Sequence, residues 1–287
     1  MTNTTGGKCM DKKTTGIIAV VVVAVVVIAA AFVMMNKDKG GDDTDNSISF
    51  LIQDNKGFYF WIEGEGDTAI AAFQDAIGQA AYKDAAAFVA STDKTSGAAN
   101  GITSLYGLTT AQDASGNWYW WTQYIWTGVA WEQSNLMMDG YGPDDANHYM
   151  AIIYGDGTNT PLANPSDAKI WDGSTSGVKF TIKSFSGMEF YINGQGTTML
   201  DAFKDATTDY NVPFQPSTDA QGDYGVDSVF GIKMESGLTE DGKTFYDYWA
   251  QYYRNSGEWG YGEGYMSTIQ SSEYKECLVS YEHSVFS

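Results

Sequence analysis

Cysteine is scarce in this 287-residue chain: Cys9 and Cys277 are the only two, on opposite sides of a long apolar run. If that run crosses a membrane, the two thiols lie in different compartments and cannot form a disulfide with each other. The sequence also lacks a CxxC pair and any Cys/His spacing typical of structural zinc. We therefore expect domains that fold by burying a large enough core, without a disulfide or a zinc ion.

Histidine is equally scarce, since His148 and His283 are the only two. The sequence contains no GxSxG nucleophile elbow and no HExxH metal motif. A glycosidase needs only two carboxylates and no motif, so this one class of enzyme stays open. The sequence as a whole predicts a protein that is not an enzyme.

Basic residues are few: 16 Lys and Arg against 36 Asp and Glu give a net charge of −20. Such a charge repels phosphate, which argues against nucleic acid as a partner. It favours solubility, with attraction of cations or basic partners as the alternative. Acid-rich segments at 42–46, 139–145 and 155–159 lack the spacing of an EF-hand. We interpret them as solvated loops, with calcium as the alternative, and assign no metal ligands.

Long apolar runs are absent with one exception, residues 17–35, which contain no charged or polar side chain. As a helix this run nearly spans the ~30 Å of a hydrocarbon core. Lysines precede it, at positions 8, 12 and 13, and favour an N-terminus on the inside. We predict a single-pass protein of the cell membrane, held through Ile17–Met35, with its C-terminal domains outside. A signal peptide cleaved near residues 29–32 is the alternative.

The chain does contain an internal repeat. FWIEGEGDTAIAAF at 60–73 aligns without a gap with FYINGQGTTMLDAF at 190–203. Two further pairs follow at a similar offset: SLYG (104–107) with SVFG (228–231), and YWWTQY (119–124) with DYWAQY (247–252).

The repeat predicts two homologous units joined by a segment with proline and glycine. Each unit is long enough to bury its own core. The predicted organisation is a cytoplasmic N-terminal segment (1–16), a transmembrane anchor (17–35), an acidic linker (36–47), a first repeat domain (48–155), a linker (156–177) and a second repeat domain (178–287).

Each unit has the pattern of a sheet with one helix. Its opening residues are β-branched and aromatic around a glycine, which is typical of strand, turn, strand. A helix then begins with Asp67 or Thr68 as its cap, and Ile70, Phe73 and Ile77 share one helical face. Further strands follow. The predicted fold class is α+β: an N-terminal transmembrane helix followed by two tandem β-rich units, each with one helix packed on its sheet.

Three segments of each unit resemble a known family. They are GDTAIAAFQDA, ITSLYG and WYWWTQYIWTG in the first unit, and TTMLDAFKDA, VDSVFG and YDYWAQYYRNSG in the second. They are similar to domains related to the C-terminal domain of transcobalamin and intrinsic factor. The resemblance covers most of both units and implies a β-grasp-like sheet crossed by a helix, in surface proteins of unknown function. The family's Gly-Asp pair before the last strand has no clear equivalent here, so cobalamin binding is not carried over.

The aromatic strand of each unit is the strongest candidate for binding. Alternate residues of a strand point to opposite faces, and both faces of this strand are rich in rings, which exceeds what one core needs. One face is therefore predicted to be an open platform for sugar rings, a corrinoid or a peptide, with a glutamine as a hydrogen-bonding group. The alternative is that the rings fill the core. The candidate residues are Trp118, Trp120, Gln123, Tyr124, Trp126 and Trp131 in the first unit, and Tyr246, Tyr248, Gln251, Tyr252 and Trp259 in the second.

Together these features predict a membrane-anchored extracellular protein with two homologous binding or adhesion modules, whose pairing raises avidity. The expected partners are a glycan, a peptide or an envelope protein. Two alternatives stay open: a structural component of the cell envelope, and a receptor for a cofactor or nutrient such as a corrinoid. No cofactor is assigned.

Overall fold

The computed structural model describes residues 46–79, 89–90 and 102–286. By their contacts, Asn46–Trp126 and Trp131–Ser287 form one compact unit, and both repeats lie within it. The predicted cytoplasmic segment, membrane anchor and most of the acidic linker lie outside the described residues. Within the described ranges, none of the helices combines the length and the apolar character that crossing a bilayer requires.

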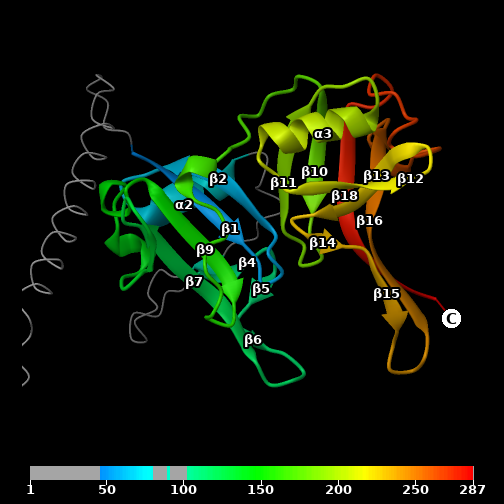
Figure 1. The fold of residues 1–287 in the computed structure, drawn as a ribbon. Coiled ribbons are helices and arrows are strands. Elements are labelled where there is room, and N and C mark those ends of the chain that lie inside the picture. Colours follow the sequence, from blue (N-terminus) through cyan, green and yellow to red (C-terminus); the bar gives the residue numbers. More distant parts are fainter. Residues whose placement is uncertain (1–45, 80–88, 91–101, 287) are drawn as a thin grey trace, which may run out of the picture. The chain divides into compact units, whose positions relative to one another are not determined.

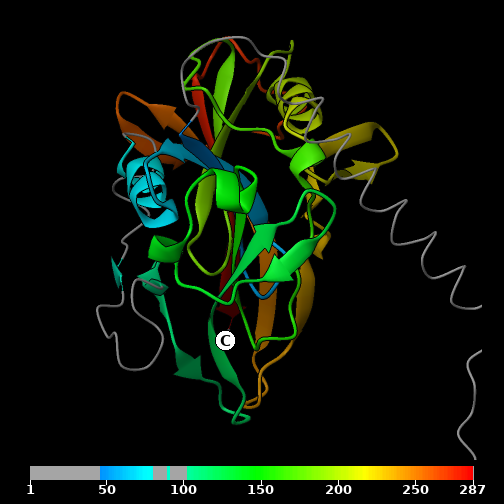
Figure 2. The same ribbon diagram turned by 90° about the vertical axis from the view of Figure 1, so that its left-hand side faces the viewer.

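The first repeat is built on a six-stranded sheet in the order β2-β1-β9-β7-β6, with β8 paired to β7. β1 is antiparallel to β2 and parallel to β9, whereas β7 is antiparallel to β9. α2 follows β2 in the chain and packs on β2 and β1, where Figures 1 and 2 show it in cyan. The bounds are β1 Ser47–Gln53, β2 Tyr59–Glu65, α2 Ala69–Gly78, β6 Ala111–Gln112, β7 Trp118–Trp126, β8 Trp131–Gln133 and β9 Tyr149–Gly155.

The second repeat has the same strand order, β11-β10-β18-β16-β15, with β17 paired to β16. β10 is antiparallel to β11 and parallel to β18, and β16 is antiparallel to β18. α3 crosses β11 and β10 (Figure 1), as α2 does in its own repeat. The bounds are β10 Val178–Lys183, β11 Glu189–Gly194, α3 Met199–Asp209, β15 Glu235–Leu238, β16 Thr244–Asn255, β17 Glu258–Tyr261 and β18 Glu276–Phe286.

Each repeat also carries a small three-stranded sheet, in the orders β3-β4-β5 and β12-β13-β14. Short 3₁₀-helices complete the described elements. The bounds are β3 Val89–Ala90, β4 Ile102–Leu105, β5 Leu108–Thr109, η1 Met138–Gly140, η2 Asp144–Ala146, η3 Pro165–Asp167, β12 Phe214–Asp219, β13 Gly222–Val229 and β14 Ile232–Lys233.

The glycines of the repeated GxG segment let each helix lie directly on its strand. A Cβ placed on Gly64 would be 2.1 Å from the Ala72 carbonyl oxygen, and one on Gly194 would be 2.2 Å from that of Ala202. No side chain fits at such distances, so both positions require glycine for close packing. Thr68 caps α2 by accepting a hydrogen bond from the Ala71 N–H at 3.3 Å.

The hairpins β4–β5 and β13–β14 have the same two-residue turn, and its sequence recurs in the two repeats. Tyr106 and Gly107 have φ values of 53° and 76°, and Phe230 and Gly231 have 55° and 75°. Positive φ at both central residues is the type I′ geometry, whose twist matches that of the flanking strands. The SLYG and SVFG segments therefore encode the same turn in the two copies.

A continuous apolar core joins the two repeats. Phe60 and Phe190 are equivalent residues of the two copies, and their rings stack with centroids 5.3 Å apart and planes 5° apart. Buried residues of both repeats belong to one core cluster. The buried Asp54 carboxylate accepts a hydrogen bond from the Ser186 hydroxyl at 2.9 Å, between one copy and the other. Burial raises the pKa of Asp54, against the effect of this and its backbone hydrogen bonds.

The predicted α+β class is wrong, because the described residues are mostly β: strands make up 47% of them and helices 14%. α2 and α3 are the only α-helices of the described residues. The prediction assigned one sheet and one helix to each unit, and it included ITSLYG (102–107) among the strands. In the structure this segment belongs to a separate small sheet, β3-β4-β5, and the second repeat has its own small sheet and the β15–β16 hairpin. The described residues also give no support to the transmembrane helix that was part of the predicted fold.

Candidate functional site

The aromatic strand of each repeat divides its side chains between two faces of the sheet. The face that carries the helix, the inner face, takes Trp121 in β7 and Trp249 in β16, and both are buried. Their indole N–H groups donate to equivalent carbonyls, those of Leu108 at 2.9 Å and Ile232 at 2.8 Å. On the inner face, these hydrogen bonds hold a hairpin against the sheet in both copies. The opposite face, which we call the outer face, is therefore left for a ligand.

The two predicted glutamines do not lie among the outer rings. Gln251 alternates with Tyr252 along β16 and so belongs to the inner side, where its amide donates to the Trp249 carbonyl. Gln123 lines a cleft of about 450 Å³ at the edge of β7, together with Trp120. We assign no site to this cleft, because the chain that leads into its Ile102–Thr103 wall lies outside the described residues.

In the first repeat, the outer face is covered by residues 159–171, a segment that we call the strap. The strap is held by side chains of the sheet that bind its backbone. The Tyr124 hydroxyl donates to the Asn159 carbonyl at 2.8 Å, and the Trp131 indole donates to the Ala163 carbonyl at 2.9 Å. Gln53 makes two contacts, donating to the Thr160 carbonyl at 3.1 Å and accepting from the Leu162 N–H at 2.9 Å.

Apolar side chains of the strap complete this arrangement. Ala163 is buried in a cluster that includes Leu51, Trp61 and Tyr124 of the sheet, and Ile170 packs against it. Ile170 also forms an isolated parallel bridge with Trp61. The segment predicted as a linker is therefore, in part, an extended chain docked on an aromatic sheet face.

The candidate rings of the first repeat have different surroundings. Tyr124 is only 7% exposed beneath the strap, and Trp126 packs edge-on against Trp131, with ring centroids 5.3 Å apart. Trp120 lies against the backbone of Gly157, where an added Cβ would come within 2.5 Å of the ring. Trp118 is exposed. The structure does not bring these five rings together as one platform.

The second repeat has an equivalent outer face, and there the part formed by β16, β17 and β18 is uncovered among the described residues. By the repeat, Tyr252 is equivalent to Tyr124 and Trp259 to Trp131. Several rings meet solvent: Tyr246 is 47% exposed, Trp259 41% and Tyr261 68%. We call this surface the β16 face and define it by Tyr246, Tyr248, Tyr252, Trp259, Tyr261, Leu278 and Phe286.

A hydrogen-bond network orders the rings of the β16 face. The Tyr252 hydroxyl lies 2.9 Å from a Glu282 carboxylate oxygen and 2.8 Å from the Tyr261 hydroxyl. Burial, followed by these two hydrogen bonds, raises the pKa of Tyr252, so its hydroxyl stays neutral. Arg254 lies over the Trp259 ring at 5.7 Å and pairs with Glu276 at 3.0 Å. The rings are thus held in place before any ligand arrives, which lowers the entropy cost of binding.

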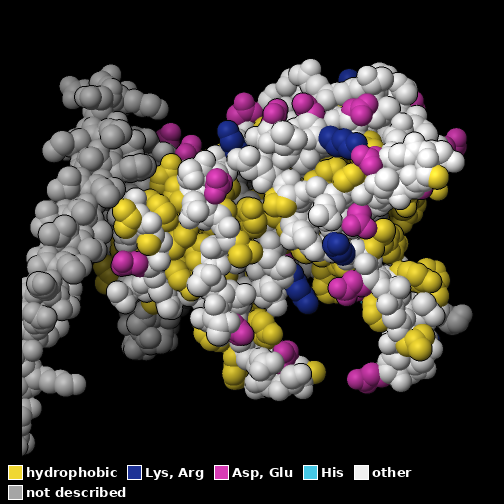
Figure 3. Space-filling model, viewed as in Figure 1, with side chains coloured by type: hydrophobic (Ala, Val, Ile, Leu, Met, Phe, Trp, Pro, Cys, Tyr) yellow, Lys and Arg dark blue, Asp and Glu magenta, His cyan; other side chains and the backbone are white. Residues whose placement is uncertain are grey.

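One end of the β16 face is a shallow groove of about 500 Å³, lined by Thr244, Tyr246, Tyr248 and Phe286. The Tyr246 and Phe286 rings meet edge to face with centroids 5.6 Å apart. Figure 3 shows hydrophobic side chains at the surface along the β15–β16 hairpin, at the lower right. Exposed apolar groups gathered in this way mark an interaction surface.

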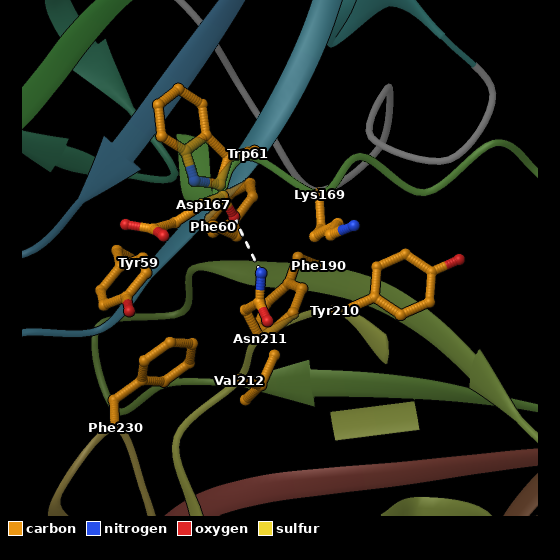
Figure 4. Close-up of a pocket in the computed structure, with 10 residues that line it drawn as sticks. All are labelled: Tyr59, Phe60, Trp61, Asp167, Lys169, Phe190, Tyr210, Asn211, Val212 and Phe230. Atoms are coloured by element: carbon orange, nitrogen blue, oxygen red, sulfur yellow. Dashed lines mark hydrogen bonds between the residues drawn. The ribbon is translucent and has the colours of Figure 1, made fainter. Parts of the chain in front are cut away.

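A second cavity, shown in Figure 4, is too small for an organic ligand. Its volume of about 20 Å³ is enough for one water molecule. The Trp61 indole N–H, on its wall, is buried without a hydrogen-bond partner among the described residues. Burial raises the pKa of the Tyr59 hydroxyl on the same wall, and the Asp167 carboxylate adds to the effect. The cavity therefore has room for a single water molecule next to the Trp61 N–H, and we assign no ligand to it.

The strap is the functional feature that sequence reasoning missed. Pro161, Pro165 and the DGSTSG segment are typical of a linker, and that interpretation hid two apolar residues, Ala163 and Ile170. Two apolar residues seven positions apart, with prolines between and beside them, are too few to predict an element. Only the fold shows that they meet the outer face.

Comparison with protein-family models and with curated proteins finds no match to this chain. The resemblance to domains of the transcobalamin and intrinsic factor family therefore stays a prediction from the sequence, and the site described above is argued from this chain alone.

Proposed function

We propose that the protein is a binding protein without catalytic activity, whose second repeat holds an extended peptide segment of a partner protein on the β16 face. The observation that carries the proposal is the strap. The first repeat already binds an irregular, proline-containing chain, interrupted by the short helix η3, on the equivalent face, through one tyrosine, one tryptophan and one glutamine.

Two of the residues that hold the strap are aromatic in both copies. Tyr252 stands where Tyr124 binds the Asn159 carbonyl, and Trp259 stands where Trp131 binds the Ala163 carbonyl. Grooves lined by aromatic rings are a common means of recognising extended proline-containing peptides, because the preformed chain loses little entropy on binding.

The differences between the two faces also support reversible binding at the second. Leu51 and Ile153 are buried under the strap, and their equivalents in the second repeat, Thr181 and Ser280, are also buried but carry hydroxyl groups. An apolar face needs permanent cover, whereas a face of tyrosines with hydroxyl groups between them tolerates water when it is empty. The β16 face has the second character.

The test is binding of the full-length chain to a library of peptides built on the strap sequence, with prolines kept at the positions of Pro161 and Pro165. Retained peptides are then measured by calorimetry. We expect Trp259→Ala to weaken binding by about tenfold or more, as the loss of a central aromatic anchor does. Trp118→Ala is the matched control, since this exposed tryptophan lies outside the β16 face, and it leaves binding unchanged.

A glycan is the second candidate, because exposed tyrosine and tryptophan rings also stack on sugars. The same variants on a glycan array distinguish the two. Glycan binding that is lost in Trp259→Ala, with no retained peptide, replaces the peptide proposal. Peptide binding that is equal in Trp259→Ala and the parent chain contradicts the assignment of the site.

A further inference from the structure

A cavity of about 460 Å³ lies beside the inner face of the second repeat, away from the β16 face. Its size falls within the range of small-molecule sites. The walls come from the β10–β11 turn, the β13–β14 hairpin, the start of β15, strands β16 and β18, and the β1–β2 turn. The residues used below are Lys56, Phe185, Phe230, Lys233, Glu235, Asp247, Tyr281 and His283.

One wall is a row of three ionisable side chains on neighbouring strands. Asp247 is directly opposite Glu235 on β15 and directly opposite His283 on β18. The His283 Nδ1 lies 2.6 Å from an Asp247 carboxylate oxygen. Two carboxylates directly opposite each other repel, so the row favours a cation placed between them. Burial, and then the charges of Asp247 and Glu235, raise the pKa of Tyr281 to about 12, which shows that both carboxylates act on this wall.

Another part of the lining is basic. Lys56 and Lys233 both line the cavity, and within the described ranges neither belongs to an ion pair. Asp54, which also lines the cavity, offers them no ready partner, because its oxygens accept from the backbone of Lys56 and Phe58 and from Ser186.

The remaining walls are aromatic. Phe185 is 63% exposed, and its ring lies edge-on to His283 with centroids 6.4 Å apart. Phe230 adds a second ring at the turn of the β13–β14 hairpin. A ring that is exposed at the mouth of a cavity has apolar area still to bury, which a ligand side chain can cover.

The equivalent position in the first repeat is occupied differently. Tyr119 stands where the second repeat has Asp247, and its ring stacks on Tyr154 with centroids 6.2 Å apart. Tyr154 and its equivalent Tyr281 make the same hydrogen bond, to the carbonyls of Thr109 and Lys233 at 2.8 Å. The scaffold is therefore the same, and the exchange of a ring for a carboxylate is particular to the second copy.

We propose that this cavity binds a small zwitterion of the α-amino acid class, with its ammonium group at Glu235 and Asp247, its carboxylate at Lys56 and Lys233, and an apolar side chain against Phe185 and Phe230. A site with charges of both signs and an apolar wall matches a ligand with the same three features. This site is independent of the β16 face.

The test uses the full-length chain in titration calorimetry, with L-phenylalanine and L-leucine as the first probes. 2-Phenylethylamine lacks the carboxylate, and 3-phenylpropionate lacks the ammonium group. We expect the amino acids to bind and each of the truncated probes to bind at least tenfold more weakly. Equal binding of the amine and the amino acid overturns the proposal, as does the absence of heat with every amino acid of a standard panel.

Variants then assign the two ends of the ligand. We expect Glu235→Gln to weaken the amino acid at least tenfold without weakening 3-phenylpropionate, and Lys233→Met to weaken it without weakening 2-phenylethylamine. Glu240→Gln, an exposed carboxylate in the β15–β16 loop, is the matched control and keeps full affinity. Trp259→Ala should also keep full affinity for the amino acid, so failure of this proposal can be distinguished from failure of the proposed function of the β16 face. Variants that bind like the parent chain overturn the assignment.

Discussion

The outer faces of the two repeats share one scaffold and differ in what covers them. In the first repeat the strap lies over Trp61 and Tyr124, whereas the β16 face of the second repeat is open among the described residues. Leu51 and Ile153 beneath the strap are apolar, whereas their equivalents Thr181 and Ser280 are polar. Permanent cover allowed one copy to become a second hydrophobic core, while the other kept its rings and gained hydroxyl groups around them. The same face of the repeat thus serves stability in the first copy and offers a binding surface in the second copy.

The largest expected effect separates the covered face from the open one. Trp61 is buried under the strap, so Trp61→Ala should lower the free energy of unfolding by about 3–5 kcal/mol. The equivalent Tyr191 is only partly buried and meets the strap at the Trp171 ring, so Tyr191→Ala should cost about 1–2 kcal/mol. Urea denaturation of the two variants measures the difference. Equal losses of stability would contradict the claim that the strap buries Trp61 more deeply than Tyr191 is buried in the second repeat.

The next effect concerns a feature that both copies share. Gly64→Ala and Gly194→Ala each push a Cβ to within about 2 Å of a helix carbonyl, since the distances are 2.1 Å and 2.2 Å. Each should therefore destabilise the protein by about 1–3 kcal/mol or more, and by similar amounts. Gly78→Ala is the control, because an added Cβ meets nothing within 4 Å there. A clear difference between the first two variants would show that the helices pack unequally.

The smallest effect isolates one hydrogen bond to the strap. Tyr124→Phe removes the donor to the Asn159 carbonyl and should cost about 0.5–1.5 kcal/mol. Tyr252→Phe, on the open face, should change stability by less than about 0.5 kcal/mol, because its partners Glu282 and Tyr261 can bond to water instead. Thermal melts followed by circular dichroism provide the comparison. A larger loss from Tyr252→Phe would reverse the roles assigned to the two faces.

Local signals in the sequence predicted local structure well. The helix beginning at Thr68 follows from capping chemistry, and Phe73 and Ile77 are buried as their spacing predicts. The sequence shows that the glycines of the GxG segment recur, whereas the structure shows that Gly64 and Gly194 serve the approach of a helix to its own sheet. A glycine pattern shows that a side chain is not tolerated, and only the fold shows which atoms exclude it.

Contacts between distant segments could not be read from the sequence. Each phenylalanine of the Phe60–Phe190 pair fits the core of its own unit equally well, so nothing in the pattern links the copies. Strand β12 was missed because Pro216 argues against a strand. The structure accommodates this proline where the pairing register shifts, between Gln215 and Pro216.

Candidate residues that lie close together in the sequence could be predicted as a group, whereas candidate residues on distant strands could not. The alternating rings of β16 predicted Tyr246, Tyr248 and Tyr252 together, and they do share one face. The Asp247–His283 pair joins residues 36 positions apart, on strands whose pairing no motif announces. Such a pair becomes visible only when the sheet order is known.

The stack of Phe60 on Phe190 has an evolutionary consequence. A residue that meets its own counterpart is what a two-fold axis produces, as in a homodimer with an isologous interface. Two identical chains that paired through this residue and were later joined would give such a contact. Fusion removes the constraint that every substitution must appear on both sides of the axis, and this freedom permits one half to specialise while the other half keeps the pair folded.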